Sequence, residues 1–340
     1  MDDLVVGPVA QLAELVRARR VLLVCTTDRA GIGGMFDEVE RFGDFSPNPR
    51  LADALAGARV AERYAPDLIV GVGGGSAMDV AKLVRALPIG PARDALAGRV
   101  PPVRRAPLVL VPTVFGSGSE VTSFATVYVD GVKHSLDHPS VRADLAVVDP
   151  LLARTCPPDV AHSAALDALS HAVESLWALR STVESRALAT AALGTTEGFR
   201  AAISAGLAIE RTRTTAAHAF AYPLTARHGV RHGLACALNL VWLLPLTADL
   251  VARECQDPRG VAFVRRRLAD IRAVLGDDPG AAVAARIEAG GFSPWLSDHG
   301  VREADLPGLV TAALGANRAT NGPVRLTPAT VLPYLRTRLA

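Results

Sequence analysis

The sequence predicts two consecutive domains, an α/β domain with a mostly parallel sheet in residues 1–150 and an all-helical domain in residues 151–340. In the first part, short apolar runs at 21–25, 68–72, 108–111 and 145–148 alternate with helical stretches, as in strands joined by crossover helices. After residue 150, long segments rich in alanine and leucine have helical periodicity, with turn residues at 277–280 and 290–291. No segment of this second part has a convincing strand pattern.

Length and composition exclude several classes of protein. The chain has 340 residues, of which 50% are hydrophobic, enough for a buried core in each of two domains. A net charge of +2 without a basic run argues against a nucleic-acid partner. The acidic N-terminal segment has no cleavage site, and no uninterrupted apolar stretch approaches the length of a membrane span. We therefore expect a cytoplasmic protein without a membrane partner that acts on a small molecule.

The cysteines are few and scattered. Cys25, Cys156, Cys236 and Cys255 form no C-x-x-C pair, which argues against a disulfide framework and against a thiolate zinc site. We expect each of them to be a small buried hydrophobic residue.

The stretch LIVGVGGGSAMDVAK at 68–82 predicts a phosphate-binding turn between a strand and a helix. We expect Ser76 to cap the helix and Asp79, three residues later, to complete a capping box. Glycine at such a turn lets backbone N–H groups approach a phosphate at the positive end of the helix. The expected coenzyme contacts of this turn are Gly73, Gly74, Gly75, Ser76 and Asp79.

A second loop, VPTVFGSGSEVTSFATVY at 111–128, follows another apolar run and is dense in small and hydroxylated residues. Its expected coenzyme contacts are Thr113, Ser117 and Ser119. The first turn differs from the common G-x-G-x-x-G fingerprint and would be weak evidence alone. Two such loops in one domain indicate a dinucleotide.

Four residues of the second domain make a complete set of metal ligands: Asp167 and His171 in LDALSHAVES, and His218 and His232 in HAFAYPLTARHGVRHG. The four-residue gap places Asp167 and His171 on one face of a helix, where both can reach a single ion. Three imidazole nitrogens and one carboxylate oxygen suit Zn²⁺ or Fe²⁺ better than Mg²⁺ or Ca²⁺. A lone D-x-x-x-H pair is more often an ordinary helix pair, so the rest of the chain decides.

Taken together, these motifs resemble the iron-containing (group III) alcohol dehydrogenases, a superfamily related in fold to the dehydroquinate synthases. The resemblance is carried by GGGSAMDVAK, PTVFGSGSEVT, the D-x-x-x-H pair and two histidines fourteen residues apart, and it extends through VVDP at 147–150 to TNGPVRLTPATVLPYLR. It implies an N-terminal Rossmann-like domain that binds NADH or NADPH, an all-α C-terminal domain that holds one divalent metal, Fe²⁺ or Zn²⁺, and an active site in the cleft between them. We also expect a homodimer.

The resemblance implies an alcohol dehydrogenase or aldehyde reductase in which the metal polarises a carbonyl oxygen while the nicotinamide delivers hydride. Many family members place a proton-relaying histidine four residues after the first histidine of the second pair, whereas this chain has Tyr222 there. Either Tyr222 or His228 is then the proton donor, and His228 is equally well explained as a structural histidine.

Coenzyme choice depends on the residue after the strand at 21–25. The family often has an aspartate there, which bonds the ribose hydroxyls and repels a 2′-phosphate. This chain places Thr26 at that position, and a hydroxyl tolerates either coenzyme. Alternatively, the alignment is shifted by two residues and Asp28 excludes NADPH.

Lysine occurs only as Lys82 and Lys133 in a chain rich in arginine. Either chance left these two lysines, or a compact ammonium is needed where a planar guanidinium does not fit. In the second case Lys133 would supply a positive charge near the active site.

Within the family, GSGSEVTSFATVYVDGVKHSLDHPS and DALSHAVESLWALRSTVESRALA resemble the phosphonoacetaldehyde reductase branch of phosphonate biosynthesis. This implies reduction of phosphonoacetaldehyde to 2-hydroxyethylphosphonate, with Lys133, His134 and Ser135 as substrate contacts and Lys133 also in the catalytic set. Further hydroxyls that suit a phosphonate are those of Ser181, Thr182 and Ser185, although structural hydrogen bonds would also explain them.

Other functions remain open from the sequence. Phosphonopyruvate is a second candidate substrate, and a general alcohol dehydrogenase is a third possibility. A dehydroquinate-synthase-like lyase is disfavoured by the PT-x-x-GSGSEVT loop, and a metal-free maleylacetate-reductase-like enzyme by the intact ligand set. A non-catalytic scaffold would have no reason to keep four ligands and two phosphate loops.

Overall fold

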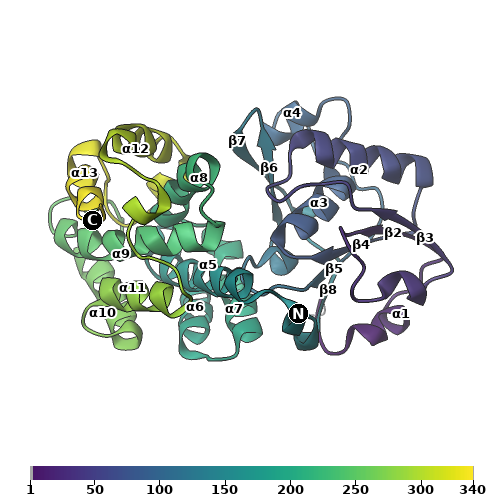
Figure 1. Ribbon diagram of the computed structural model, residues 1–340, viewed down its shortest axis with the longest axis horizontal. Helices are drawn as coiled ribbons and strands as arrows, with labels where there is room; N and C mark the ends of the chain where they lie inside the picture. The colour runs from purple at the N-terminus through teal and green to yellow at the C-terminus, as the bar shows by residue number, and fades with distance from the viewer. Residues whose placement is uncertain (1–2, 340) are drawn as a thin grey trace. The chain divides into compact units, whose positions relative to one another are not determined.

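The computed structural model describes residues 3–339 and divides the chain into two compact units, Met1–Cys156 and Pro157–Ala340 (Figure 1). This division lies beyond the boundary expected at residue 150, because the 3₁₀ helix Pro150–Thr155 belongs to the first unit. Asp149, which precedes that helix, accepts hydrogen bonds from the backbone N–H groups of Leu151 and Val9, each at 2.9 Å. The carboxylate thereby ties the end of the first unit to its N-terminal segment.

The first unit is built on a six-stranded sheet with strand order β1-β8-β5-β4-β2-β3, in which every neighbouring pair is parallel. The strands are β1 Leu4–Val6, β2 Arg20–Val24, β3 Glu38–Phe42, β4 Leu68–Gly73, β5 Leu108–Pro112 and β8 Leu145–Val148. The α/β fold with a parallel sheet is therefore confirmed. The sequence interpretation omitted β1, which has only three residues, and β3, whose charged residues interrupt its apolar pattern.

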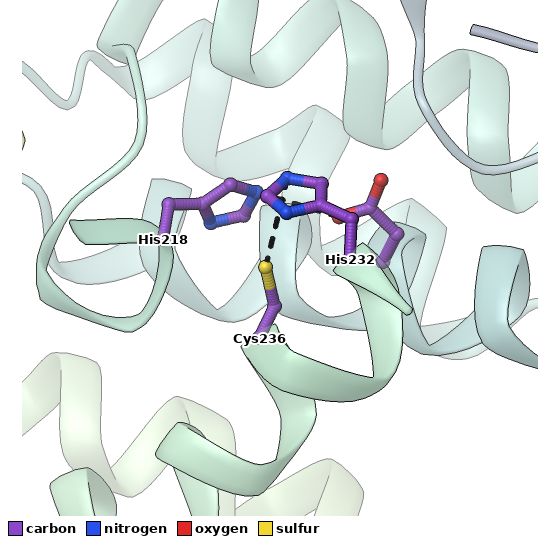
Figure 2. A group of neighbouring side chains, drawn as sticks. His218, His232 and Cys236 are labelled. Atoms are coloured by element: carbon purple, nitrogen blue, oxygen red, sulfur yellow. Dashed lines mark hydrogen bonds and ion pairs between the residues drawn. The ribbon is translucent and has the colours of Figure 1, made fainter. Parts of the chain in front are cut away.

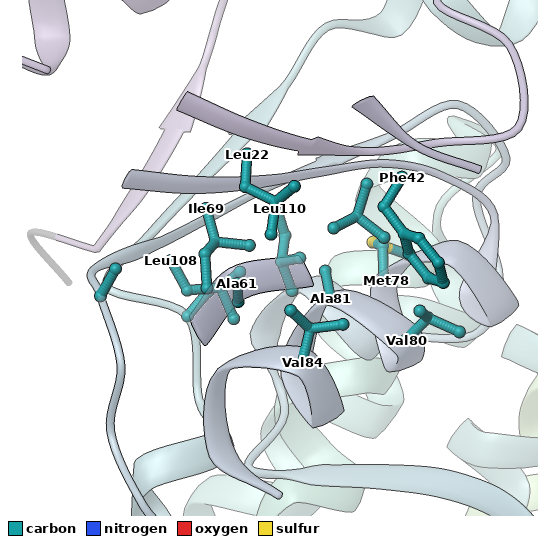
Figure 3. Packing of buried hydrophobic residues seen from close by; sticks show 13 residues of the cluster. Leu22, Phe42, Ala61, Ile69, Met78, Val80, Ala81, Val84, Leu108 and Leu110 are labelled. Atoms are coloured by element: carbon teal, nitrogen blue, oxygen red, sulfur yellow. The ribbon is translucent and has the colours of Figure 1, made fainter. Parts of the chain in front are cut away.

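Both faces of the central strands are buried, which explains their continuous apolar runs. The helices of this unit are α1 Leu12–Leu15, α2 Leu51–Tyr64, α3 Gly75–Ala86 and α4 Ala92–Leu96. Figure 3 shows the core on one face of the sheet, in which Leu22, Ile69 and Leu110 pack against Met78 of α3. Gly71 lets α3 lie directly on the sheet, because a Cβ there would come within 2.5 Å of the Ala81 side chain.

A separate two-stranded hairpin consists of β6 Phe124–Val129 and β7 Val132–Asp137. Asp130 and Gly131 form its turn with φ angles of 52° and 78°, the left-handed pair that a type I′ hairpin turn requires. The sequence interpretation wrongly assigned residues 124–128 to a loop. The Asp-Gly dipeptide between two alternating segments was the available indication of a hairpin.

Among its described residues, the second unit contains helices and no strand, apart from an isolated bridge between Cys255 and Val324, so the expectation of an all-α second part is confirmed. Its α-helices are α5 Pro158–Trp177, α6 Val183–Gly194, α7 Gly198–Thr212, α8 Ala216–His228, α9 His232–Leu250, α10 Val261–Leu275, α11 Pro279–Ala289, α12 Leu306–Leu314 and α13 Pro328–Arg336. The predicted metal ligands lie on α5, α8 and α9, and both α5 and α8 pack against α9.

Helix α9 is long and apolar enough to cross a membrane by length and composition, and within residues 3–339 it is the one helix that meets this criterion. The sequence interpretation did not expect such a segment. In the structure, 83% of the 18-residue apolar stretch of this helix is buried inside the protein, where α9 packs against α5, α8 and α11. Its apolar character is thus explained by its position in the core of the helical unit.

Candidate metal and coenzyme sites

Four potential metal-ligating side chains converge inside the helical unit. One ligand atom from each of Asp167, His218, His232 and Cys236 lies within 4.8 Å of all the others. Figure 2 shows the two imidazoles and the thiol pointing toward one another. Asp167 comes from α5, His218 from the first turn of α8, and His232 and Cys236 from the first two turns of α9.

The predicted ligand His171 lies beside this group. Its Nε2 is 3.6 Å from Oδ1 of Asp167, as expected for residues four apart on α5, and its ring stacks on that of His218 with centroids 4.7 Å apart. The structure therefore brings all four sequence-predicted ligands together and adds Cys236.

Cys236 was expected to be only a small buried hydrophobic residue, and this interpretation was incomplete. The residue is fully buried, but its Sγ lies 3.9 Å from Nε2 of His232. One helical turn separates the two along α9, so the spacing H-x-x-x-C was an indication in the sequence. The other three cysteines are also free, with Cys25 buried and Cys156 and Cys255 half-buried.

A glycine allows α9 to bring His232 close to α5. A Cβ at Gly233 would overlap the carbonyl oxygen of Ser163 and would lie 2.8 Å from Cβ of Asp167. The hydroxyl of Ser163 also accepts a hydrogen bond from the N–H of Leu234 at 3.3 Å. The two helices consequently meet at the point from which Asp167 and His232 extend.

A buried carboxylate, which the sequence analysis missed, orients His218. Glu174 of α5 is fully buried, and one of its oxygens accepts a hydrogen bond from Nδ1 of His218. Its other oxygen accepts from the N–H and hydroxyl of Thr215, at 3.0 and 2.6 Å, and from the N–H of Ala217 at 2.8 Å. Because Nδ1 carries the proton, Nε2 of His218 presents its lone pair to the ligand cluster, an arrangement common for metal-bound histidines.

The electrostatics of the cluster favour a cation. Burial alone would raise the pKa of Asp167, but the neighbouring imidazoles, His171 first, hold it well below its usual range. The pKa of Glu174 is lowered in the same way, since His218 outweighs the effect of burial. Burial raises the pKa of the Cys236 thiol to about 11, although His218 opposes this shift. Two carboxylates thus remain ionised inside a helical core.

The residues fit a divalent metal ion. Oδ1 of Asp167 and Nε2 of His218 are buried atoms without a hydrogen-bond partner, and they lie 3.4 Å from each other. Buried polar atoms normally have a hydrogen-bond partner. Two unpaired acceptor atoms that face each other therefore indicate a cation bound between them. Carboxylate, imidazole and thiol donors together suit Zn²⁺ or Fe²⁺.

The two candidate proton donors lie at different distances from the cluster. The ring of Tyr222 stacks on that of His232, with centroids 6.1 Å apart and planes inclined by 17°. His228 is the last residue of α8, ten residues beyond His218, which corresponds to about 15 Å along a helix. It lies near Asp305, whose pKa is lowered first by hydrogen bonds from Arg302 and, to a smaller degree, by His228. This geometry favours Tyr222.

In the first unit, the two predicted coenzyme loops come together at the carboxyl ends of β4 and β5. The N–H of Thr113 donates to the carbonyl of Gly73 at 2.9 Å, and a Cβ at Gly75 would lie 3.0 Å from the Ser117 side chain. Gly73 has a φ of 144°, which side-chain-bearing residues rarely adopt. Glycine is thus required here for both conformation and close approach.

The predicted capping box of Ser76 and Asp79 is wrong. Helix α3 begins at Gly75, with Gly74 in the N-cap position, two residues before the expected cap, and no side-chain cap. Asp79 instead accepts hydrogen bonds from the hydroxyl of Ser119 at 2.7 Å and from the N–H of Thr126 at 2.9 Å. Its carboxylate therefore holds the second loop against the first.

The alternatives Thr26 and Asp28 have different environments. Thr26 is exposed, two residues beyond the last residue of β2. Both carboxylate oxygens of Asp28 accept backbone hydrogen bonds, from Ile32 at 2.9 Å and Gly33 at 2.7 Å. Asp28 is therefore engaged in the turn that follows it.

The two lysines have separate environments. Lys82 is fully buried, and its Nζ donates to Oγ1 of Thr122 at 3.2 Å and to the carbonyl of Phe124 at 2.9 Å. This lysine anchors α3 to the start of the hairpin and lies close to the buried carboxylate of Glu120. Lys133 lies on β7 and is half-buried.

The expected substrate contacts Lys133, His134 and Ser135 do not form one group. Successive side chains of a strand point to opposite faces. Lys133 and Ser135 pair with Tyr128 and Thr126 on one face, whereas His134 pairs with Val127, which is fully buried in the core of the first unit. His134 lines a surface pocket next to α4. Reading the three as a single cluster was therefore wrong.

The hydroxyls of Ser181, Thr182 and Ser185 have structural roles. The Ser181 hydroxyl accepts from Arg259 at 2.9 Å. Thr182 and Ser185 form a reciprocal capping box at the start of α6, with distances of 3.1 and 2.9 Å. These hydroxyls stabilise the helical unit.

A parallel sheet with glycine- and hydroxyl-rich loops at its carboxyl edge, and a helical unit with a buried carboxylate–imidazole–thiol cluster, define the class of metal-dependent, dinucleotide-linked oxidoreductases. Comparison with known proteins identifies the family. Residues 4–150 match the iron-containing alcohol dehydrogenases, and residues 196–339 match the C-terminal part of the Fe-containing alcohol dehydrogenase family. The chain belongs to the iron-containing alcohol dehydrogenase family, and it is an oxidoreductase that uses a nicotinamide coenzyme and a divalent metal.

Individual relatives match the chain along much of their length. The chain is 35% identical to phosphonoacetaldehyde reductase from Streptomyces viridochromogenes over 82% of this chain and 78% of that protein. It is 32% identical to long-chain-alcohol dehydrogenase 1 from Geobacillus thermodenitrificans over 70% of this chain and 63% of that protein. The crystal structure of sulfoacetaldehyde reductase from Bifidobacterium kashiwanohense in complex with NAD⁺ superposes with a TM-score of 0.84 at 25% identity, covering 99% of this chain and 96% of that one.

Proposed function

We propose that this aldehyde reductase acts on a short aldehyde that carries a phosphonate group, namely phosphonoacetaldehyde, which it reduces to 2-hydroxyethylphosphonate. The identity of 35% with the phosphonoacetaldehyde reductase of Streptomyces viridochromogenes supports this substrate. Sulfoacetaldehyde, which gives the structurally similar Bifidobacterium enzyme its name, is likewise a two-carbon aldehyde with an anionic tetrahedral group. Phosphonopyruvate, reduced to phosphonolactate, is the alternative substrate of the same chemical class.

The observation that carries this proposal is the face of β7 that holds Lys133 and Ser135. The Ser135 hydroxyl is buried without a hydrogen-bond partner, two residues from the lysine on the same face. A phosphonate oxygen would accept a hydrogen bond from this hydroxyl and a charge-assisted one from the ammonium. We therefore assign substrate binding to Lys133 and Ser135, and not to His134.

The helical unit would hold the metal through Asp167, His171, His218 and His232, with the Cys236 thiol as a further donor among them. The bound metal supplies a Lewis acid for the carbonyl oxygen of the aldehyde. Glu174 fixes His218 in the tautomer that directs Nε2 inward. Tyr222, stacked on His232, would hold the proton that the product oxygen receives, and the coenzyme would supply the hydride. In the first unit, the backbone N–H groups of Gly73–Gly75 would bind the coenzyme phosphates.

The decisive experiment compares kcat/KM for phosphonoacetaldehyde, phosphonopyruvate, sulfoacetaldehyde and propionaldehyde. We expect a preference for the phosphonates that Lys133→Ala removes by raising KM, with little effect on propionaldehyde. His134→Ala is the matched control, because it removes the adjacent side chain on the opposite face of β7. A preference of the unmodified enzyme for propionaldehyde would refute the proposal and indicate a general alcohol dehydrogenase.

A further inference from the structure

Arg41 occupies the part of the sheet edge where the adenosine half of a dinucleotide coenzyme is selected. It lies on β3, paired in register with Leu23 of β2. Its guanidinium extends past the end of β2 and donates a hydrogen bond from NH1 to the carbonyl oxygen of Thr26 at 2.8 Å. In parallel sheets of this kind, the residues just after the second strand of the nucleotide-binding half determine whether a ribose 2′-hydroxyl or a 2′-phosphate is bound.

This position shares its sheet edge with the glycine-rich turn. β2 pairs directly with β4, and both run parallel, so their carboxyl ends lie side by side. Thr26 follows β2, and Gly73, Gly74 and Gly75 stand at the end of β4. A dinucleotide whose pyrophosphate is bound at these glycines would therefore extend its adenosine ribose toward the end of β2.

The guanidinium of Arg41 differs from the other arginines of the β2–β3 edge. Arg19 pairs with Glu38 at 3.0 Å, and Arg63 of α2 pairs with Glu40 at 2.7 Å. Within residues 3–339, Arg41 has no carboxylate within ion-pair distance, and its side chain is exposed. A guanidinium has five N–H donors in a planar fork, so the bond to Thr26 leaves donors for a phosphate.

Asp28, the first carboxylate after Thr26 in the sequence, is engaged elsewhere. The two oxygens of Asp28 are engaged by the N–H groups of Ile32 and Gly33. The chain after Arg41 stays close to β2, because Gly43 has no side chain and a Cβ there would lie 2.5 Å from the carbonyl of Cys25. The end of β2 thus presents a neutral hydroxyl with a guanidinium beside it.

We propose that Arg41, together with Thr26, binds the 2′-phosphate of NADPH, so that this enzyme prefers NADPH to NADH. The inference concerns coenzyme selection and depends on family membership, not on the phosphonate substrate. It also goes beyond the tolerance of both coenzymes that a threonine at this position predicts, since it assigns the phosphate a specific cationic partner.

Equilibrium binding of NADPH and NADH, followed by nucleotide fluorescence on the intact enzyme without an aldehyde, tests the proposal independently of the substrate. We expect the unmodified enzyme to bind NADPH at least tenfold more tightly than NADH. Arg41→Met should weaken NADPH binding about tenfold and change NADH binding less than twofold, because charge-assisted bonds to phosphate are lost. Thr26→Asp should also reverse the preference by adding a charge that repels the 2′-phosphate.

Arg19→Met is the matched control, since Arg19 is an exposed arginine next to the amino end of the same β2–β3 pair. It removes the same charge from the opposite edge of the sheet, and we expect the NADPH/NADH ratio to stay unchanged. Competition by 2′-AMP and 5′-AMP gives a measurement that needs no variant, with 2′-AMP expected to compete more strongly. Equal or tighter binding of NADH by the unmodified enzyme, or equal losses for both coenzymes in Arg41→Met, would overturn the proposal.

Discussion

Replacing Glu174 by glutamine should weaken metal binding although the residue touches no metal. In the structure, the Glu174 carboxylate accepts a hydrogen bond from Nδ1 of His218 and three further hydrogen bonds from Thr215 and Ala217. Glutamine has nearly the same shape but no charge, and one half of its amide donates instead of accepting. His218 would therefore lose its ionic partner, and Nε2 would become a weaker donor to the metal.

Loss of such a carboxylate partner typically lowers metal affinity 10- to 100-fold, or about 1.4–2.7 kcal/mol. The measurement is the Zn²⁺ dissociation constant of the purified protein, obtained by competition with a chromophoric chelator. The control variant is Asp257→Asn, which also neutralises a buried carboxylate of the helical unit, one paired with Arg259 at 2.7 Å. A Zn²⁺ dissociation constant within twofold of the parent in folded Glu174→Gln would show that Glu174 does not act on the metal through His218.

Three further substitutions test other parts of the structure. Gly233→Ala should destabilise the helical unit by about 1–3 kcal/mol and reduce the amount of bound metal, because the added methyl group overlaps the Ser163 carbonyl. Urea unfolding measures this loss, and Gly198→Ala, where the space around the glycine is open, is the control. Cys236→Ser should remove a thiolate charge-transfer band from the Co²⁺-substituted enzyme, since Sγ lies among the ligand atoms, and a band of equal intensity in both proteins would contradict this. Asp79→Ala should lower the free energy of unfolding by about 1–3 kcal/mol and raise the coenzyme KM, because Ser119 and Thr126 lose their hydrogen-bond acceptor. An unchanged KM would show that coenzyme binding does not depend on these hydrogen bonds between the two loops.

The fold could be predicted where one physical cause dominates the local sequence. β4 and β5 are buried on both faces, so their continuous apolar runs identify them as strands in the sequence. The alanine- and leucine-rich helices of the second unit have a clear helical periodicity. β3 lies at the edge of the sheet, where only part of each residue is buried, and its sequence EVERF has no such pattern. The start of α3 was misplaced because a serine three residues before an aspartate imitates a capping box, while the actual cap is a glycine.

Much of the metal cluster could also be derived, because helix geometry is regular. Asp167, His171 and Glu174 are spaced by four and three residues and therefore lie on one face of α5, so Glu174 was within reach of the same reasoning. Cys236 follows His232 by one turn in the same manner. The meeting of α5 with α9 was not predictable, since it depends on the absence of a side chain at Gly233, and one glycine in a helical pattern has many explanations.

The substrate segment illustrates how a motif depends on the secondary structure that carries it. On a helix, residues four apart share a face, and Asp167 and His171 accordingly lie together. On a strand, neighbours in sequence separate, and the string KHS divides into Lys133 and Ser135 on one face and His134 on the other. The prediction of one anion-binding group followed from assigning residues 124–128 to a loop and from missing the strand at 132–137 that pairs with them. The Asp-Gly turn at 130–131, with both residues at positive φ, makes the hairpin and thereby removes His134 from the substrate group.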